Sequence, residues 1–480
     1  MQDRNTFRTR AGIRTSPWLA GAITLALGLP AFAQDKPTVE ELQRRLEALE
    51  QRYGGGTAAD GQALDLAALD QRLRALERNL ELKEEARAAR EKEAPVVAVN
   101  DKGASFKSGN GDYELKIRGL LQGDGRFFTG GEPAGANDTF LLRTARPIFE
   151  GTLGKWVGYR IMPEFAGDSA SIADVYADLK FSPAATVRVG KFMAPVGLER
   201  LQSSSALHDI ERSLASELNP NRDIGVQLQG DVAGGKVGYA VGVFNGAVDG
   251  RDAVTSNPDN NFEYAGRVFF EPLKGSDSFW SGLGFGIGGS VGEVEGSGNN
   301  LLPRYRSAGQ QQFFGYRSSV AADGRRTRWS PQGYFYRNGF GLLAEYVSSS
   351  QEVQAGTVRA ELENTAWQAT ASWVLTGEDA SYRGIKPARP FAPGKDGWGA
   401  WELVARYGEL EVDDAAFPVF ADPSVSARNA QAWVAGVNWY LNSNLKLVVN
   451  YLQTGFEGGA AAGADRETEK AVFTRLQVAF

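Results

Sequence analysis

The sequence predicts an all-β fold, a transmembrane antiparallel β-barrel of about sixteen strands, preceded by a short periplasmic coiled-coil helical region. Three observations predict it: an N-terminal export signal, strand-like segments with a two-residue period after residue 111, and a last such segment ending on Phe480. Lipid-facing residues of a barrel strand alternate with polar ones, so a barrel needs no long apolar segment. The absence of such a segment after the export signal is therefore compatible with a membrane protein.

Residues 1–33 have the pattern of a secretory signal peptide. Four arginines and Asp3 form the basic head, residues 18–29 are apolar, and Pro30-Ala31-Phe32-Ala33 ends the segment. The apolar run is shorter than the roughly 20 residues of a membrane-spanning helix. Removal of the four arginines and Asp3 moves the net charge from −6 to −9. An exported chain of this charge is not expected to bind nucleic acid.

Composition and the single histidine argue against enzymatic chemistry. The chain has no cysteine, so disulfides and thiolate metal sites are excluded. His208 lies beside Asp209 and shortly after Ser203, Ser204 and Ser205, in one loop. A hydrolase triad needs side chains that converge in space, and neighbours along a loop do not provide this. We therefore expect no catalytic residues, no metal and no cofactor.

Residues 34–95 form a separate helical region. Its apolar residues recur at alternating spacings of three and four on both sides of Gly54-Gly55-Gly56, and Thr38 with Glu41 matches a capping box. The apolar positions are Val39, Leu42, Leu46, Leu49, Tyr53, Leu66, Leu69, Leu73, Leu76 and Leu80. This heptad pattern predicts a periplasmic coiled coil. A single amphipathic helix docked on the barrel is the alternative.

Residues 96–480 are assigned to the barrel. Sixteen strand-like segments begin near residues 113, 140, 156, 172, 186, 225, 237, 262, 281, 329, 340, 362, 399, 430, 445 and 470. Short connections such as Asn338-Gly339, a strong hairpin signal, alternate with long ones at 194–224, 245–261 and 292–328. This predicts short periplasmic turns on one rim and long loops on the other. Pro147, Pro163 and Pro331 interrupt three proposed strands.

The last strand has a clear register. Val472, Thr474, Leu476, Val478 and Phe480 share one face, which we expect to meet lipid, while Arg475 and Gln477 face the lumen. The first strand, which must pair with it, carries Lys116 and Arg118. The seam of the barrel is therefore expected to border a basic path.

Arginines and lysines on inward registers or in long loops are the candidate functional residues. Rings of such residues let a water-filled pore prefer anions, because guanidinium pairs with oxyanions and stays charged at physiological pH. The candidates are Lys116, Arg118, Arg143, Arg146, Arg200, Arg212, Arg304 and Arg306. Glu164, Asp174 and Asp178, also on inward registers, could balance them, and rim residues could instead pair with lipopolysaccharide phosphates.

Several segments resemble the phosphate-selective porins, the porin O and P family of Gram-negative outer membranes. The resembling segments are Tyr-Glu-Leu-Lys-Ile-Arg-Gly-Leu-Leu-Gln from Tyr113, Leu-Leu-Arg-Thr-Ala-Arg-Pro from Leu141, Val-Gly-Lys-Phe-Met-Ala-Pro-Val-Gly-Leu-Glu-Arg ending at Arg200, Ile-Glu-Arg-Ser-Leu from Ile210, Leu-Pro-Arg-Tyr-Arg-Ser-Ala-Gly-Gln from Leu302, Leu-Thr-Gly-Glu from Leu375, Gly-Ala-Trp-Glu-Leu from Gly399 and Val-Asn-Trp-Tyr from Val437. The resemblance implies a trimeric sixteen-stranded barrel whose third and fifth outer loops fold inward. It further implies that Arg200 and Arg212 lie at the central constriction, Lys116 and Arg143 in the lumen, and Arg304 with Arg306 in an arginine ladder.

The chain departs from the family pattern at three places. Its ladder segment has two arginines where better-known members have about four, Thr144 stands where an adjacent arginine is common, and Leu120 replaces a first-strand arginine. Arg118, one pleat away on the same face, is expected to compensate. What the resemblance implies is a passive, anion-selective channel for phosphate or polyphosphate in the outer membrane, a homotrimer surrounded by lipid and lipopolysaccharide. The same barrel for another solute, and a structural barrel tethered to the cell wall, are the alternatives.

Overall fold

The structure is a computed structural model that describes residues 44, 47–48, 66–130 and 136–480. The expected signal peptide and most of the first heptad segment lie outside the described residues. Sixteen antiparallel strands form a closed barrel, so the predicted fold class is confirmed. The strands are β3 (Glu114–Gly130), β4 (Thr139–Leu153), β5 (Val157–Glu164), β6 (Ser171–Ser182), β7 (Ala185–Met193), β8 (Arg222–Val232), β9 (Val237–Phe244), β10 (Glu263–Phe270), β11 (Leu283–Glu295), β14 (Val320–Arg337), β15 (Phe340–Ala355), β16 (Val358–Val374), β17 (Ala400–Glu411), β18 (Ala427–Tyr440), β19 (Leu445–Gly458) and β20 (Glu469–Ala479).

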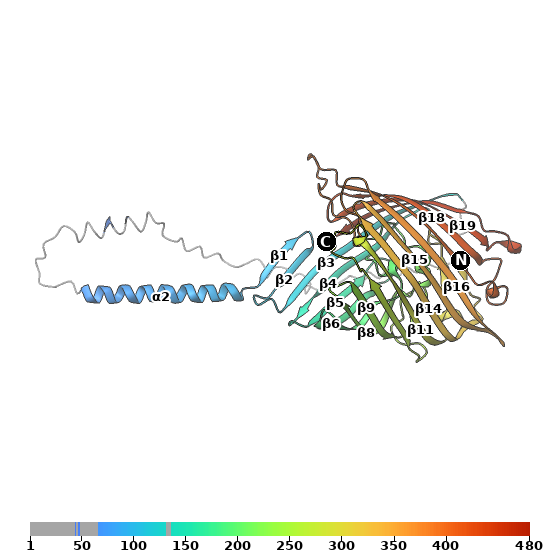
Figure 1. Cartoon of the computed structure of the whole chain (residues 1–480), viewed down its shortest axis with the longest axis horizontal. Helices are drawn as coiled ribbons and strands as arrows, with labels where there is room; N and C mark the ends of the chain where they lie inside the picture. The colour runs from blue at the N-terminus through green and yellow to red at the C-terminus, as the bar shows by residue number, and fades with distance from the viewer. Residues whose placement is uncertain (1–43, 45–46, 49–65, 131–135) are drawn as a thin grey trace, which may run out of the picture. The chain divides into compact units, whose positions relative to one another are not determined.

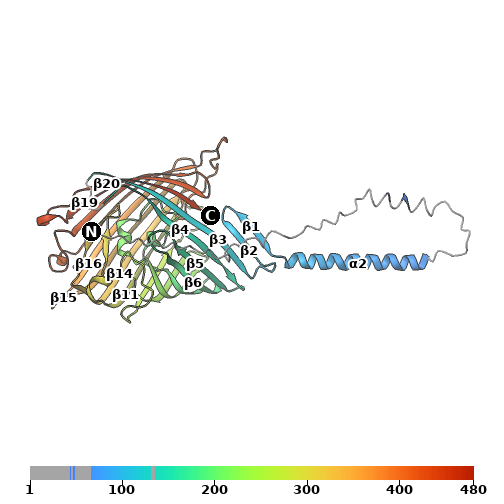
Figure 2. The same ribbon diagram turned by 180° about the vertical axis from the view of Figure 1, so that it is seen from behind.

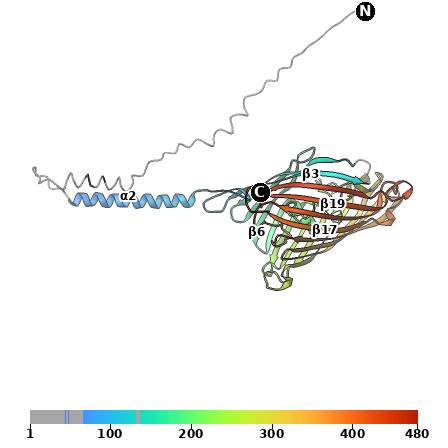
Figure 3. The ribbon, with the colours of Figure 1, turned by 90° about the horizontal axis from the view of Figure 1, so that it is seen from above.

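The barrel closes where β20 pairs with β3. Figure 3 shows the red C-terminal strands beside the cyan β3, and Figures 1 and 2 place the C-terminus at the end where β3 begins. Phe480 and Gly119 exchange backbone hydrogen bonds of 3.0 and 2.9 Å. Leu476 is 51% exposed on the outer face, whereas Arg475 and Gln477 are buried on the inner face. The expected register of the last strand is therefore confirmed.

The three prolines lie within strands. Pro147 pairs opposite Gly119, and the β5–β6 register shifts between Met162 and Pro163. Pro331 lies where the β14–β15 pairing skips from Trp329 to Gln332, although it still pairs opposite Ile287 on β11. Only Pro163 thus lies at a register shift, which accommodates a residue that has no N–H to donate.

A hairpin precedes the barrel and was not predicted. It consists of β1 (Val96–Asn100) and β2 (Gly103–Lys107), and β2 pairs with the first residues of β3. Farther along the strand, from Leu120 onward, the same edge of β3 pairs with β20. The hairpin therefore continues the seam where the last strand ends.

The helical region is described only in part. Its described helix, α2 (Leu66–Glu93), leaves Leu76 and Leu80 about 60% exposed. Exposed leucines at heptad spacing are expected on a helix that packs against another helix in a coiled coil. The coiled coil itself stays a prediction. No helix among the described residues is long and apolar enough to cross a membrane.

The connections fall on two rims. One, called here the terminal rim, carries Phe480 and short turns such as 154–156, 183–184, 233–236 and 338–339. The opposite rim, called here the loop rim, carries the long connections 194–221, 245–262, 296–319 and 412–426. The structure departs from the expected rule at residues 375–399, a long connection on the terminal rim between β16 and β17.

Apolar side chains of three loop-rim connections form a core inside the barrel. The main buried cluster includes Leu214 and Leu218 of 194–221, Phe313 of 296–319 and Phe420 of 412–426. These pack with inward residues of β15 to β20, such as Leu362. Loop 296–319 also contains the small hairpin β12 (Arg304–Arg306) and β13 (Gln312–Gly315). The loops thus occupy the lumen beside β15–β20, and open space remains beside the strands from β3 to β10.

Candidate functional site: an arginine-lined cavity in the lumen

A cavity of about 820 Å³ lies between the inner face of strands β3 to β10 and loop 194–221. Its lining contains seven arginines and only two aspartates. The arginines are Arg118, Arg146, Arg160, Arg188, Arg222, Arg267 and Arg383. Three further carboxylates, those of Glu150, Glu164 and Asp178, contact these arginines from outside the lining. The excess of positive charge that remains attracts anions.

Strand alternation explains why these side chains face inward. On β5, Arg160 lines the cavity while its neighbour Ile161 is 43% exposed on the outer face. On β6, Asp174 lines the cavity while Val175 is 38% exposed. Successive side chains of a strand point to opposite faces, so polar residues at every second position become the wall of the lumen.

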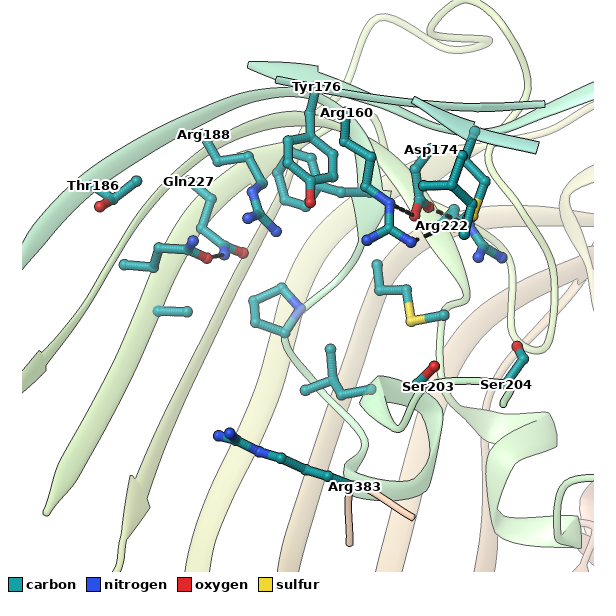
Figure 4. A pocket seen from close by; sticks show the side chains of 18 of the residues that line it. Arg160, Asp174, Tyr176, Thr186, Arg188, Ser203, Ser204, Arg222, Gln227 and Arg383 are labelled. Carbon is teal, nitrogen blue, oxygen red and sulfur yellow. Dashed lines mark hydrogen bonds and ion pairs between the residues drawn. The ribbon is translucent and has the colours of Figure 1, made fainter. Parts of the chain in front are cut away.

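Three arginines share two carboxylates along this wall. Arg118 and Arg160 contact Glu150 at 3.1 and 3.3 Å. Arg160 and Arg222 contact Asp174 at 3.4 and 2.6 Å, as the dashed lines in Figure 4 show. The chain of contacts therefore keeps one positive charge in excess while its guanidinium groups are held in place.

Two further arginines have one carboxylate each. Arg146 binds Glu164 at 2.6 Å and lies 3.4 Å from the Ser204 hydroxyl. Arg188 makes a two-pronged contact with Asp178 at 2.7 and 2.9 Å. The Arg188 guanidinium also lies 3.9 Å from the centre of the Tyr176 ring, a cation–π contact that Figure 4 shows within the cavity.

Arg267 and Arg383 differ from the other five. The Arg267 guanidinium donates to the Gln332 amide oxygen at 2.8 Å and lies 4.4 Å from the Phe269 ring centre. Neither Arg267 nor Arg383 has a carboxylate within ion-pair distance among the described residues. In Figure 4, Arg383 lies across the cavity from Arg188, with Ser203 and Ser204 near the same side. These two arginines therefore contribute positive charge that the other acid of the lining, Asp231, offsets only in part.

Buried hydrogen bonds fix loop 194–221 against the barrel wall. Its short helix α3 (Leu198–Leu201) begins where Glu345 of β15 accepts from the Leu198 N–H at 2.8 Å and the Glu199 N–H at 3.3 Å. The first N–H groups of a helix have no partner within it, so a carboxylate there stabilises the helix start. From the other rim, the Tyr382 hydroxyl of 375–399 donates to the Leu198 carbonyl at 2.7 Å.

A second anchor of the loop is Glu211. Arg143 donates to its carboxylate at 2.8 and 3.1 Å, and Arg126 donates at 2.5 Å. Burial raises the pKa of a carboxyl group, but the charges of Arg143, Arg126 and Arg475 outweigh it and hold the Glu211 pKa well below its usual range. Glu211 is therefore ionised at neutral pH.

The structure brings two of the eight predicted residues into the cavity, Arg118 and Arg146. Lys116 lies apart on β3 and contacts Glu114 at 3.3 Å. Arg143 is engaged by Glu211, as described above. Arg304 lines a separate cavity of about 440 Å³ at the loop rim. Arg306 lies two residues farther along β12 and is not part of that lining.

Arg200 and Arg212 lie within loop 194–221 and contact its own backbone. The buried Arg200 guanidinium donates to the Ser216 carbonyl. Arg212 donates to the Gln202 carbonyl at 2.7 Å. Burial, with the nearby charge of Arg200, lowers the Arg212 pKa to about 9. In this arrangement both side chains hold the loop in its fold, and neither lines the large cavity.

Five cavity arginines escaped the sequence prediction: Arg160, Arg188, Arg222, Arg267 and Arg383. The first two could have been found by register, because their partners Asp174 and Asp178 were assigned to the inner face. Arg383 lies in a terminal-rim connection, where no pattern predicts an inward fold. Its position depends on contacts such as the stacking of Tyr382 on Tyr334, 5.4 Å between ring centres.

His208 has a positioning role. Its imidazole lies 3.0 Å from Glu402 and 3.2 Å from the Tyr336 hydroxyl, both on the barrel wall. These contacts attach loop 194–221 to β14 and β17. In the part of the chain that the structure describes, no group of three or more His, Asp or Glu side chains is arranged to hold a metal ion.

A family model described as phosphate-selective porin O and P matches residues 115–480. Porin O of Pseudomonas aeruginosa is 24% identical over 420 residues, covering 81% of this chain and 93% of that protein. An uncharacterised protein of Caulobacter vibrioides is 23% identical over 367 residues, covering 73% and 70%. Among solved structures, the outer membrane channel DcaP of Acinetobacter baumannii superposes with a TM-score of 0.49 at 12% identity, covering 78% of this chain and 99% of that one.

Proposed function

Because the chain belongs to the phosphate-selective porin O and P family, whose members are outer-membrane channels, we propose that it is a passive channel that prefers anions, inorganic phosphate among them. The observation that carries the preference is the cavity with seven arginines and two aspartates in its lining. A channel acts by lowering the electrostatic and desolvation barriers to transit, and it needs no catalytic residue.

The ion pairs on the cavity wall favour weak, transient binding of anions over tight binding. An anion that contacts Arg160 or Arg222 competes with Asp174, so each contact is weaker than one to an uncompensated guanidinium. Conduction needs sites that are favourable enough to enter and weak enough to leave. The arginines along the wall offer such sites in series, and Arg267 and Arg383 supply the net positive potential.

We further propose that the chain is exported by a signal peptide cleaved after Ala33 and assembles as a homotrimer. Family membership supports the outer membrane as its location. The heptad pattern of residues 34–95 supports association of parallel copies in the periplasm. Lipid and lipopolysaccharide would then surround the outer face of the barrel. The eight basic residues predicted from the sequence would either line the path of the anion or hold the loops that shape this path.

Single-channel recording in a planar bilayer tests the proposal. In a KCl gradient, the reversal potential should take the sign of chloride preference. Inorganic phosphate titrated to millimolar concentration should reduce the chloride current, because phosphate occupies the same sites longer. Cation preference, or a chloride current indifferent to phosphate, would contradict the proposal.

A further inference from the structure

The two sides of the arginine-lined cavity differ in chemistry. The strand side carries most of the arginines, and the loop side presents Pro195, Leu201 and the hydroxyls of Ser203 and Ser204. Apolar side chains also stand between the arginines on the strands, among them Ile148 and Met162. The cavity thus carries most of its arginines on the strand side, whereas its loop side combines apolar groups, hydroxyl groups and Arg383.

Inorganic phosphate would use only the polar part of this mixed lining. Phosphate carries oxygens in every direction, and each loses solvation where no donor replaces water. Ser203, Ser204 and Arg383 offer donors on the loop side, but Leu201 offers only hydrocarbon, so a phosphate beside Leu201 would turn some of its oxygens toward apolar surface. An anion with an apolar body avoids this cost, because its headgroup meets the arginines and its body meets the loop.

Resting on the function proposed above, we propose that the cavity is a subsite for organic anions: phosphate monoesters or carboxylates whose body is aromatic or aliphatic. Arg160, Arg188 and Arg222 bind the headgroup. Leu201 and Pro195 contact the body, and the Tyr176 ring beside Arg188 offers a stacking surface. The volume of about 820 Å³ is large enough for such an ion with part of its water.

A series of phosphate monoesters with one headgroup and different bodies tests the subsite. We expect phenyl phosphate to halve the chloride current at a concentration about tenfold lower than methyl phosphate, which corresponds to about 1.4 kcal/mol. Glucose 1-phosphate separates apolar contact from size, because its body is larger than phenyl and polar. It should block no better than methyl phosphate. Equal block by all three monoesters, or equal block by the phenyl and glucosyl esters, would overturn the inference.

Substitution of Leu201 locates the effect in the cavity. In Leu201→Ser, the advantage of phenyl over methyl phosphate should fall from about tenfold to about twofold, and in Leu201→Met it should persist. Leu273→Ser is the matched control, since Leu273 lies in the terminal-rim connection between β10 and β11 and outside the cavity lining. A full phenyl advantage in Leu201→Ser would overturn the assignment to this loop. The monoester series on the unaltered channel decides the inference even if that variant does not fold.

The failures of the two proposals can be told apart. A chloride-preferring channel that phosphate blocks, but that does not distinguish phenyl from methyl phosphate, retains the proposed function and loses the subsite. A cation-preferring channel loses both.

Discussion

At the scale of single residues, the arginines of the cavity differ in how far their charge is compensated. Arg188 is held by both oxygens of Asp178, whereas Arg267 has only the amide oxygen of Gln332. A guanidinium beside a carboxylate contributes little net potential at a distance, because the two charges nearly cancel. Arg267 should therefore contribute to selectivity through its own charge, whereas the intact pair of Arg188 and Asp178 should act mainly through local contacts with a passing ion.

Neutral substitutions at these two arginines should have unequal effects. Arg267→Gln should lower the ratio of chloride to potassium permeability by about twofold, on the order of 0.5 kcal/mol. Arg188→Gln should lower it further, because Asp178 would then stand unneutralised in the lumen. Reversal potentials in a KCl gradient measure both. The control is Arg359→Gln, whose side chain is 66% exposed and pairs with Asp323 outside the cavity. A larger effect from Arg267→Gln than from Arg188→Gln would contradict this account.

At the scale of elements, loop 194–221 shapes the cavity, and buried charges keep it there. Glu345 accepts a hydrogen bond from the first N–H of α3. Glu211 forms ion pairs with Arg126 and Arg143, and His208 forms a hydrogen bond with Glu402. Removing one partner of a buried ion pair costs about 3–5 kcal/mol, because the remaining charge is left without compensation. The loop therefore has one strongly preferred position, and the cavity keeps its shape.

The Glu211 anchor gives a pH prediction. The folded-state pKa of Glu211 lies below the ordinary value of 4.5, so its contribution to stability is fully present above that value. The contribution is lost only as pH falls toward the depressed pKa. Glu211→Gln should therefore raise open-channel current noise already at pH 7, whereas the unaltered channel should become noisy only well below pH 4.5.

The control for this prediction is Glu293→Gln, whose carboxylate is 55% exposed and lies 3.7 Å from Arg325 on the loop rim. That variant should match the unaltered channel at both pH values. A quiet Glu211→Gln channel at pH 7 would mean that the loop does not depend on this ion pair.

At the scale of the whole molecule, the lumen is filled unevenly. Three loops and their apolar core occupy the space beside β15–β20, and the cavity remains beside β3–β10. The helical region is separate in the sequence from every residue of this cavity. We therefore expect conduction to depend on the barrel and its loops alone, and we propose that residues 34–95 serve association or attachment.

Deletion of residues 38–91 tests this separation. Single-channel conductance and phosphate block should be unchanged, because no residue of the cavity lining is removed. Envelope integrity, measured by sensitivity of cells to detergent, should decline if the segment tethers the barrel. A changed conductance would show that the helical region takes part in the channel.

Much of the fold could be predicted from the sequence, because it follows from local pattern. The two-residue period specifies which side of each strand meets lipid, and the register of residues 472–480 was correct for that reason. Asn338-Gly339 is a short turn, as a local hairpin signal implies. The hairpin of β1 and β2 escaped prediction because it completes the edge of β3, a need that appears only once β20 is in place.

The sequence by itself determined the fold class and the inward register of the strands. The alternation of apolar and polar residues is a property of consecutive positions, and it acts before any long-range contact forms. Only the tertiary structure decided which arginines line the cavity, because the positions of residues 194–221 and 375–399 depend on contacts between residues far apart in the chain. Glu345 with Leu198, and Tyr382 with the Leu198 carbonyl, are two such contacts, and they place Leu201 and Arg383 on the side of the cavity that faces the strands.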